Sequence, residues 1–311
     1  MSVSQHPTAI ISPHARLGQN IEIGPYSVIG DNVQLANNIK IHSHVVIDGH
    51  TRIGSGCEIF PFAAIGLAPQ HTRYEGEASE LIIGENNLMR EYVTMHPGTK
   101  VGNMKTIIGD NNLFYVGAHV AHDCVVGNHV ILGNHVGVGG HVTIGDYAYL
   151  GGYSAIHQFV RIGEHAIIGG GTAVTADVIP YGLASGPRGA LHGLNIVGLR
   201  RRGFEREALT ALKKAYAGLF ASEGLFKENL AKTKAELGEH DMVEKLVQFI
   251  EDGADRHLCQ PQKIGISYGT AWYYCSKRFA SARAGTSRPV KRRAPFYHLS
   301  GRPVRCRFFS L

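Results

Sequence analysis

The residues best suited to chemistry in this chain are histidines that stand beside an aspartate and a glycine. His122 precedes Asp123, and eighteen residues later Gly140 precedes His141. An imidazole next to a carboxylate can act as a general base, because the carboxylate fixes its tautomer and supports the imidazolium that forms. A glycine N–H can stabilise an oxyanion, since no side chain blocks the approach. No Ser or Cys nucleophile has suitable neighbours, so these residues favour direct acyl transfer over an acyl-enzyme.

A six-residue repeat of apolar residues should position these groups. Steps of six from Ile11 reach Leu17, Ile23, Ile29, Leu35, Ile41, Ile47, Ile53, Ile59 and Ile65, return at Ile83, Met89, Met95 and Val101, and after a slip of one residue continue through Ile108, Phe114, Val120, Val126, Leu132, Val138, Ile144, Leu150, Ile156, Ile162, Ile168 and Val174. A period of six fits neither a helix face nor an alternating strand and is typical of a hexapeptide parallel β-helix. Glycine often follows the apolar residue, which suits a corner because glycine adopts backbone conformations closed to other residues.

The repeat also predicts which residues are stacked. Three hexapeptides form a coil of eighteen residues, so residues eighteen apart should lie one above the other at about 4.8 Å. The expected column comprises His122, Asp123, Gly140, His141, His157 and Gln158. Titratable side chains on a prism of Val, Ile and Gly form a candidate site, and the alternative is a set of solvated histidines on a flat β face.

Two interruptions break the repeat. Residues 66–82 keep the count of six but lose the apolar residue at His71 and Glu77, which predicts a loop that protrudes from the prism. A shorter interruption occupies residues 102–106, where the phase slips. Insertions in repeat proteins map to one face and often bind ligands, so both segments point to a binding function.

The fold class expected from these patterns is mainly β. We expect a parallel β-helix of hexapeptide repeats over residues 1–190, with the protruding loop near 66–82, and a C-terminal α-helical domain over 191–255. Hexapeptide prisms are known as left-handed, although the spacing alone does not set the hand. Residues 175–200 form a connector, and helices are expected at 204–220, at 223–237 and from Asp241, which has a capping-box spacing to Glu244, to a C-cap at Gly253.

The net charge of +6 hides an uneven distribution. Residues 1–255 hold 19 basic and 25 acidic side chains, whereas residues 256–311 hold twelve basic ones and no acid. Three interpretations of this tail stay open: a segment that binds nucleic acid or a membrane surface, a disordered extension, or a stretch translated out of frame. We base no function on it and expect no nucleic-acid partner.

Composition favours a cytoplasmic protein without an integral membrane segment. No stretch reaches the roughly 18 apolar residues of a membrane span, and the first ten residues lack the pattern of a signal peptide. The five cysteines are irregularly spaced and form neither a disulfide framework nor a CxxC metal pair. We therefore expect no metal and no cofactor.

Three motifs make the chain resemble a known family. AHDC at 121–124, AIHQF at 155–159 and GLRRRGF at 198–204 are similar to those of the UDP-N-acetylglucosamine O-acyltransferases, over about residues 6–255. The resemblance implies a homotrimer of left-handed β-helices with active sites between subunits. It also implies transfer of an R-3-hydroxyacyl group from acyl carrier protein to the 3-position of UDP-N-acetylglucosamine, the first step of lipid A biosynthesis.

The same resemblance implies roles for single residues. His122 would be the general base with Asp123 as its support, and the Gly140 N–H would bind the oxyanion. The substrate contacts implied are Gln70 and Arg73 from the protruding loop of a neighbouring subunit, His141, His157 and Gln158 for the sugar nucleotide, and Asn195, Arg201 and Arg202 for the diphosphate. A basic cluster, formed by Arg200, Arg201, Arg202, Arg206, Lys213 and Lys214, would steer the acidic carrier protein.

One further position agrees with the family pattern. Gly170 matches the position that limits acyl length in the family, and a glycine there favours C12–C14 chains over C10.

Three other positions depart from the family pattern. His71 and Arg73 replace an acidic residue and a lysine, which leaves open whether the acceptor carries a 3-hydroxyl or a 3-amino group. Val197 stands where the family often has a glutamate, which would weaken a ribose or phosphate contact.

Three alternative functions agree less well with the sequence. The related N-acyltransferase has about a hundred residues before its repeats, whereas these repeats start near residue 10. A γ-type carbonic anhydrase would hold zinc with three histidines, but its H-x4-H pair is replaced by His119-x2-His122. A non-catalytic β-helix scaffold explains the repeats but neither the loops, the histidine column nor the helices.

Overall fold

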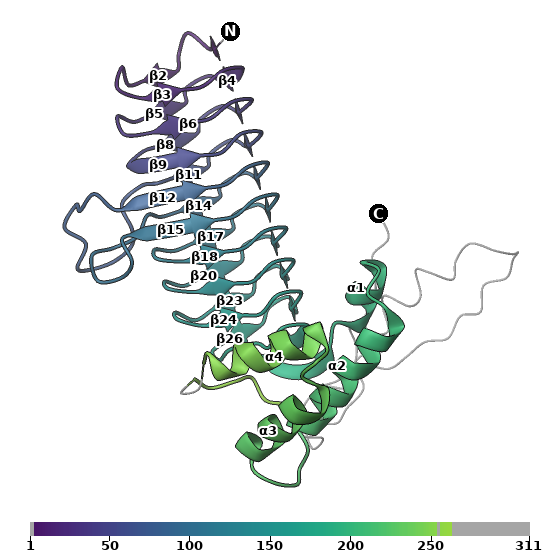
Figure 1. Ribbon diagram of the computed structural model, residues 1–311. Coiled ribbons are helices and arrows are strands. Elements are labelled where there is room, and N and C mark those ends of the chain that lie inside the picture. The colour runs from purple at the N-terminus through teal and green to yellow at the C-terminus, as the bar shows by residue number, and fades with distance from the viewer. Residues whose placement is uncertain (1–2, 254–255, 263–311) are drawn as a thin grey trace, which may run out of the picture. The chain divides into compact units, whose positions relative to one another are not determined.

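The computed structural model describes residues 3–253 and 256–262, and its core is a prism of parallel β-coils (Figure 1). Strands from successive coils align into three parallel sheets, here called A, B and C, each of which forms one face of the prism. The chain passes from A to B to C and back to A, so three edges separate the faces. The predicted parallel β-helix is therefore confirmed.

Each sheet takes every third strand of the coils. Sheet A contains β1 (Val3–Gln5), β4 (Ile21–Ile23), β7 (Lys40–Ile41), β10 (Glu58–Ile59), β13 (Leu88–Met89), β16 (Leu113–Phe114), β19 (Ile131–Leu132), β22 (Tyr149–Leu150), β25 (Ile167–Ile168), β27 (Gly182–Ser185) and the antiparallel β28 (Ala190–Leu194). Sheet B contains β2 (Ile10–Ile11), β5 (Val28–Ile29), β8 (Val46–Ile47), β11 (Ala64–Ile65), β14 (Thr94–Met95), β17 (His119–Val120), β20 (Gly137–Val138), β23 (Ala155–Ile156) and β26 (Ala173–Val174). Sheet C contains β3 (Arg16–Leu17), β6 (Gln34–Leu35), β9 (His50–Ile53), β12 (Glu80–Ile83), β15 (Lys105–Ile108), β18 (Val125–Val126), β21 (Thr143–Ile144) and β24 (Arg161–Ile162).

The apolar residues of the repeat fill the prism, but the expected place of Val101 among them was wrong, because Val101 lies between β14 and β15 and is 43% exposed. Ile41 pairs with Ile59, and Ile59 pairs with Met89 one coil further on, and all three side chains are buried. Full burial of such a side chain contributes about 1.5–3 kcal/mol, and no single coil could bury its own core. Stability therefore comes from stacking, and the coil register is fixed by it.

The expected reason for the glycines after the apolar residues was wrong. Apart from Gly66, these glycines do not have positive φ, and the left-handed corner positions carry Asn, His or aromatic residues such as His141 (φ 61°) and Tyr147 (φ 59°). What glycine provides is space: a Cβ at Gly24 would lie 2.7 Å from the backbone carbon of His42 in the next coil. Close stacking of the coils, rather than backbone freedom, selects glycine there.

Both interruptions of the repeat lie at the edge between sheets B and C. The first occupies 66–79, between β11 and β12, and the second occupies 96–104, between β14 and β15 (Figure 1). The Lys100 N–H donates to Glu77 Oε1 at 2.8 Å, and the Lys100 ammonium pairs with Glu75. The two inserted segments are therefore in contact with each other.

Helices follow the coils. They are α1 (Ile196–Arg201), α2 (Arg206–Leu219), α3 (Phe226–Leu237) and α4 (Asp241–Glu251). Contacts between Lys245 and Glu164 (3.0 Å) and between the Arg161 guanidinium and the Phe249 ring (4.2 Å) hold α4 to the last coils. No helix within residues 3–253 and 256–262 is long and apolar enough to cross a bilayer.

Three local expectations for the C-terminal part were incomplete or wrong. The connector at 175–200 contains the β27–β28 hairpin and the start of α1. Asp241 is the first residue of α4 and not its N-cap, because His240 takes that position without a side-chain bond, and Asp252 rather than Gly253 is the C-cap. Asp241 can still stabilise the helix, since a carboxylate in the first turn interacts favourably with the helix dipole.

The first seven residues of the basic tail pair with the prism. Leu258 bridges Asp177, Pro261 bridges Leu191, and Arg256 forms an ion pair with the buried Asp177 at 3.0 Å. The interpretation of the tail, residues 256–311, as a disordered extension is therefore wrong for residues 256–262. Residues 263–311, for which the three interpretations stay open, lie outside the described residues.

Candidate active site

The expected column of polar residues lies at the B–C edge. Val120 pairs with Val138, and Val138 pairs with Ile156, so the residues that follow each of them occupy equivalent positions in successive coils. The His141 N–H donates to the His122 carbonyl oxygen at 3.0 Å, which places Gly140 and His141 directly above His122. Side chains 18 residues apart are therefore neighbours, as the repeat predicts.

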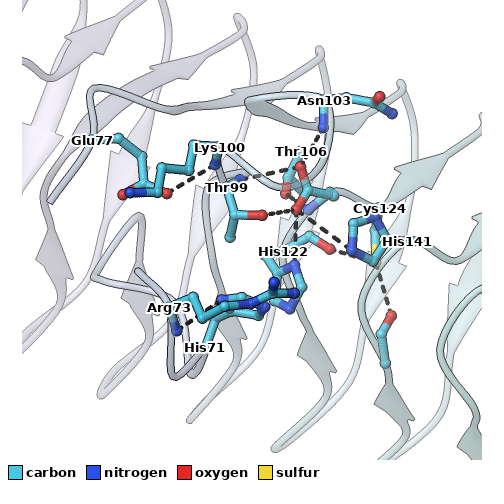
Figure 2. A network of polar contacts seen from close by, with 12 residues as sticks. His71, Arg73, Glu77, Thr99, Lys100, Asn103, Thr106, His122, Cys124 and His141 are labelled. Atoms are coloured by element: carbon cyan, nitrogen blue, oxygen red, sulfur yellow. Dashed lines mark hydrogen bonds and ion pairs between the residues drawn. The ribbon is translucent and has the colours of Figure 1, made fainter. Parts of the chain in front are cut away.

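His122 and Asp123 form a buried dyad. His122 Nδ1 lies 2.8 Å from Asp123 Oδ2, and the exposed fractions are 9% and 2% (Figure 2). Burial alone would raise the pKa of Asp123, but hydrogen bonds from Thr99, His122 and Asn103 together hold it below its ordinary value. The charged carboxylate accepts a hydrogen bond from Nδ1–H, which leaves His122 Nε2 unprotonated and able to accept a proton.

Two further imidazoles surround His122. The His141 ring lies 5.1 Å from the His122 ring and nearly perpendicular to it, and the His71 ring lies 4.9 Å away in a second edge contact (Figure 2). Burial lowers the pKa of His141, as do the neighbouring His122 and His71, while Asp123 opposes them. His141 therefore favours the neutral form, which can donate or accept a hydrogen bond to a substrate hydroxyl.

Gly140 covers the ring of His122. A Cβ at Gly140 would lie 2.6 Å from His122 Cε1 and 2.8 Å from Nε2, so any side chain there would displace the imidazole. In the part of the chain that the structure describes, the Gly140 N–H donates to no acceptor. A backbone N–H without an acceptor, at a glycine that packs on this imidazole, is a candidate oxyanion donor.

The remaining expected residues of this edge surround the dyad. His157 and Gln158 are exposed one coil above Gly140, and Gln70 and Arg73 are exposed in the segment 66–79. Figure 2 shows Arg73 beside His71, whose Nδ1 accepts from the Arg73 N–H at 3.3 Å. Residues of the first inserted segment thus reach the dyad from the same chain.

Asn195, Arg201 and Arg202 do not join this site within one chain. They lie at the C-to-A edge, at the other side of sheet C, where Asn195 caps α1 and bonds the His165 carbonyl oxygen at 2.9 Å. Arg202 Nη1 lies 3.1 Å from His165 Nδ1, and its guanidinium lies 5.0 Å from the Tyr147 ring centre.

Gly170 belongs to neither of these edges. It is exposed between β25 and β26, at the edge that separates sheets A and B. The candidate residues therefore lie at three different edges of the prism, and a single chain does not bring all of them together in one site.

The dyad and His141 also resemble a metal-binding group. One ligand atom each from His122, Asp123 and His141 lies within 4.8 Å of the others. However, His122 Nδ1 bonds the carboxylate, and both carboxylate oxygens accept further hydrogen bonds from Thr99 and Asn103. These bonds occupy the lone pairs that a cation would need, so the arrangement suits proton transfer better than metal binding.

Sequence reasoning missed Thr99 and Asn103, the donors that hold Asp123. Both belong to the segment 96–104, and the only signal for them was the phase slip at 102–106. The slip marks an insertion, but it does not tell which of its residues turn inward.

Two histidines, the buried His165 and the partly buried His119, make the stability of the fold dependent on pH. Burial, together with His96 and His122, lowers the pKa of His119 to about 4, and burial, together with Arg202, lowers that of His165 to about 4. The unfolded chain takes up these protons near pH 6.5, so the free energy of unfolding should fall as pH drops from 6.5 towards 4. Urea unfolding at pH 7 and pH 5 measures this loss, and His165→Asn should lose less over that interval. Equal losses in both proteins would contradict the assignment.

Comparison with known proteins identifies the family. Residues 177–259 match a family model described as UDP N-acetylglucosamine O-acyltransferase, domain 2, and residues 105–140 and 141–176 match the bacterial transferase hexapeptide model. The first match extends past residue 255, where the resemblance was expected to end.

Curated relatives match almost their whole length. An acyl-[acyl-carrier-protein]–UDP-N-acetylglucosamine O-acyltransferase of Rhizobium johnstonii is 43% identical over 83% of this chain and 95% of its own. The protein of that name from Thermodesulfovibrio yellowstonii is 48% identical over 82% and 98%. The crystal structure of LpxA from Acinetobacter baumannii is 41% identical, covers 83% of this chain and 99% of its own, and has a TM-score of 0.79. These matches support the predicted left-handed β-helix with C-terminal helices, and the chain belongs to the UDP-N-acetylglucosamine O-acyltransferase family.

Proposed function

We propose that this protein transfers an R-3-hydroxyacyl group from acyl carrier protein to the 3-position of UDP-N-acetylglucosamine, the first step of lipid A biosynthesis. The observation that carries the proposal is the buried His122–Asp123 dyad beneath the free N–H of Gly140, in a chain of this family. The names of the relatives supply the donor and the acceptor. The reaction takes place in the cytoplasm, where carrier-bound acyl groups and nucleotide sugars are made.

The dyad supplies the chemistry of direct transfer. His122 Nε2 removes the proton of the acceptor hydroxyl as the hydroxyl oxygen attacks the carbonyl carbon of the thioester. The Gly140 N–H binds the oxyanion of the tetrahedral intermediate, and Asp123 stabilises the imidazolium of His122. The C–S bond then breaks, and the departing thiolate takes the proton from His122. No acyl-enzyme forms.

The sugar nucleotide would bind across two chains. His141, His157 and Gln158 lie at the B–C edge with the dyad, and Gln70 and Arg73 belong to the inserted segment, where Arg73 lies beside His71. Asn195, Arg201 and Arg202 lie at the C-to-A edge and would bind the diphosphate from a neighbouring subunit. A homotrimer with sites between subunits is the assembly that brings these two edges together.

Acyl length and carrier binding involve other parts of the chain. A glycine at position 170 leaves space for a C12–C14 chain at the A–B edge of the adjoining subunit. Arg200, Arg201, Arg206 and Lys213 follow the last coils on α1 and α2, and this positive surface would attract an acidic carrier protein.

The proposal is tested by a direct transfer assay. UDP-N-acetylglucosamine and its 3-amino analogue are each incubated with carrier proteins that bear C10, C12, C14 or C16 R-3-hydroxyacyl chains. We expect transfer to the sugar, with the highest kcat/KM for C12 or C14. The absence of transfer with every donor and both acceptors would overturn the function, and hydration of CO₂ by the zinc-loaded protein would support the anhydrase instead. A preference for the 3-amino sugar would assign His71 and Arg73 to that acceptor.

A further inference from the structure

We propose that the inserted segment 96–104 is a seat for the Asp123 carboxylate and that Thr99 is a positioning residue of the reaction. This inference rests on the proposed function, because it assumes that His122 accepts the proton. The segment interrupts the repeat between β14 and β15 and lies one coil below the dyad. The segment holds the Asp123 carboxylate in place, and the carboxylate in turn orients the His122 imidazole.

Hydrogen bonds from the segment account for most of the contacts of the carboxylate. The Thr99 N–H donates to Asp123 Oδ1 at 3.1 Å, the Thr99 hydroxyl donates to Oδ2 at 2.6 Å, and the Asn103 N–H donates to Oδ1 at 2.8 Å. The fourth donor is His122 Nδ1–H. Thr99 is fully buried, so water does not replace its hydroxyl. A regular corner also supplies a backbone donor to the next coil, as the Asn128 N–H does to Asp146 Oδ1 at 2.8 Å, but the segment 96–104 gives Asp123 three donors, one of them a buried hydroxyl.

A glycine of the segment makes room for the carboxylate. A Cβ at Gly102 would lie 2.3 Å from Asp123 Cγ and within 2.5 Å of both carboxylate oxygens. The φ of Gly102 is not positive, so space and not backbone conformation requires glycine here. Gly102 below Asp123 and Gly140 above His122 thus enclose the dyad from two sides.

The same segment holds the loop that reaches the active site. The Lys100 N–H bonds Glu77, the Lys100 ammonium pairs with Glu75, and the Gly98 N–H donates to the Glu80 carbonyl oxygen at 3.2 Å. Glu75 and Glu77 lie near the end of the segment 66–79, and Glu80 is the first residue of β12. His71 of the same segment contacts His122. The segment 96–104 therefore donates hydrogen bonds to the Asp123 carboxylate and also holds the end of the segment 66–79.

Removing the Thr99 hydroxyl should weaken catalysis without weakening substrate binding. Thr99→Val keeps the shape and the backbone donor but leaves Asp123 Oδ2 with His122 alone. We expect kcat to fall about 10- to 100-fold, the range for one lost hydrogen bond to a charged group, while KM for both substrates changes less than about twofold. Thr99→Ser restores the donor and should recover most of kcat.

The pH profile separates positioning from a general structural defect. The groups that face Asp123 are His122, His141 and the donors of the segment, and loss of the Thr99 donor raises the pKa of the carboxylate. The acid limb of the kcat profile of Thr99→Val should therefore move to higher pH. Ser27→Ala, which removes a buried hydroxyl bonded to the His42 carbonyl oxygen at 2.7 Å at a distant edge, should leave both kcat and the profile unchanged.

A second substitution makes the test independent of Thr99. Gly102→Ala places a methyl group against the carboxylate, and we expect it to lower kcat at least as much as Thr99→Val. If Thr99→Val and Gly102→Ala fold and both keep wild-type kcat and pH profile, the seat is overturned. If the wild-type protein transfers no acyl group, the proposed function fails instead, so the two failures are distinguishable.

Discussion

Replacing His122 by alanine is expected to lower kcat/KM for acyl transfer by about 10²- to 10⁴-fold, the contribution of a positioned general base. The loss follows because none of the described neighbours replaces it: His71 and His141 contact the edges of the His122 ring rather than take its position, and Asp123 is enclosed by donors. His122 lies at a corner outside the apolar interior, so the variant should keep the circular dichroism and native mass of the wild-type protein. Steady-state assays with saturating acyl carrier protein measure the effect.

A corner histidine away from the dyad is the matched control. His135 also lies at a corner of the prism, where it stacks on Tyr153 at 5.1 Å, but this corner belongs to the A–B edge. His135→Ala should keep wild-type activity. Near-normal transfer by His122→Ala would remove this residue from the mechanism.

Mixed oligomers extend the test to the assembly. If His122 and Arg202 of different chains form one site, co-expressed His122→Ala and Arg202→Ala chains should regain activity that neither has alone. Random mixing leaves about a quarter of the sites with both native residues. The absence of any recovery, in oligomers shown to contain both chains, would contradict a shared site.

The sequence was a reliable guide wherever the hexapeptide repeat continued. The apolar residues of the repeat must all face inward, so the register of Val120, Val138 and Ile156 followed directly from counting. That register in turn placed His122 against His141 and Gly140. Long-range contacts are rarely so accessible from sequence, and here they were because each coil repeats the geometry of the one before.

Prediction failed where the period ended. Thr99 and Asn103 lie in an insertion with no repeat to fix their direction, and their contact with Asp123 became visible only in the folded chain. The positions of Asn195 and Arg202 likewise follow from the packing of α1 against the last coils. The hexapeptide repeat does not extend to α1, so counting residues could not predict these positions. The candidate residues within the coils were therefore predicted from the register of the repeat, and those beyond the coils were predicted from the family resemblance.

Asp123→Asn is expected to be nearly as damaging as the loss of His122, with kcat lowered about 10²- to 10⁴-fold, because it changes the tautomer of the base. The matched control is Asp110→Asn, whose carboxylate also accepts a backbone N–H, from Glu85 at 2.7 Å, but at the C-to-A edge two coils before the residues that contact Arg202. It should keep wild-type kcat.

The reason lies in the donors around Asp123. An asparagine has one carbonyl oxygen, and the N–H groups of Thr99 and Asn103 require it at the Oδ1 position. The NH₂ group then takes the Oδ2 position and donates to the Thr99 hydroxyl, which can turn to accept, and to His122 Nδ1. An imidazole that accepts at Nδ1 carries its proton on Nε2 and cannot remove the proton of the sugar hydroxyl. The same exchange in Ser-His-Asp triads lowers kcat about 10⁴-fold for this reason. NMR of ¹⁵N-labelled His122 should show the proton moving from Nδ1 to Nε2, and an unchanged tautomer with normal kcat would mean that Asp123 does not set the state of the base.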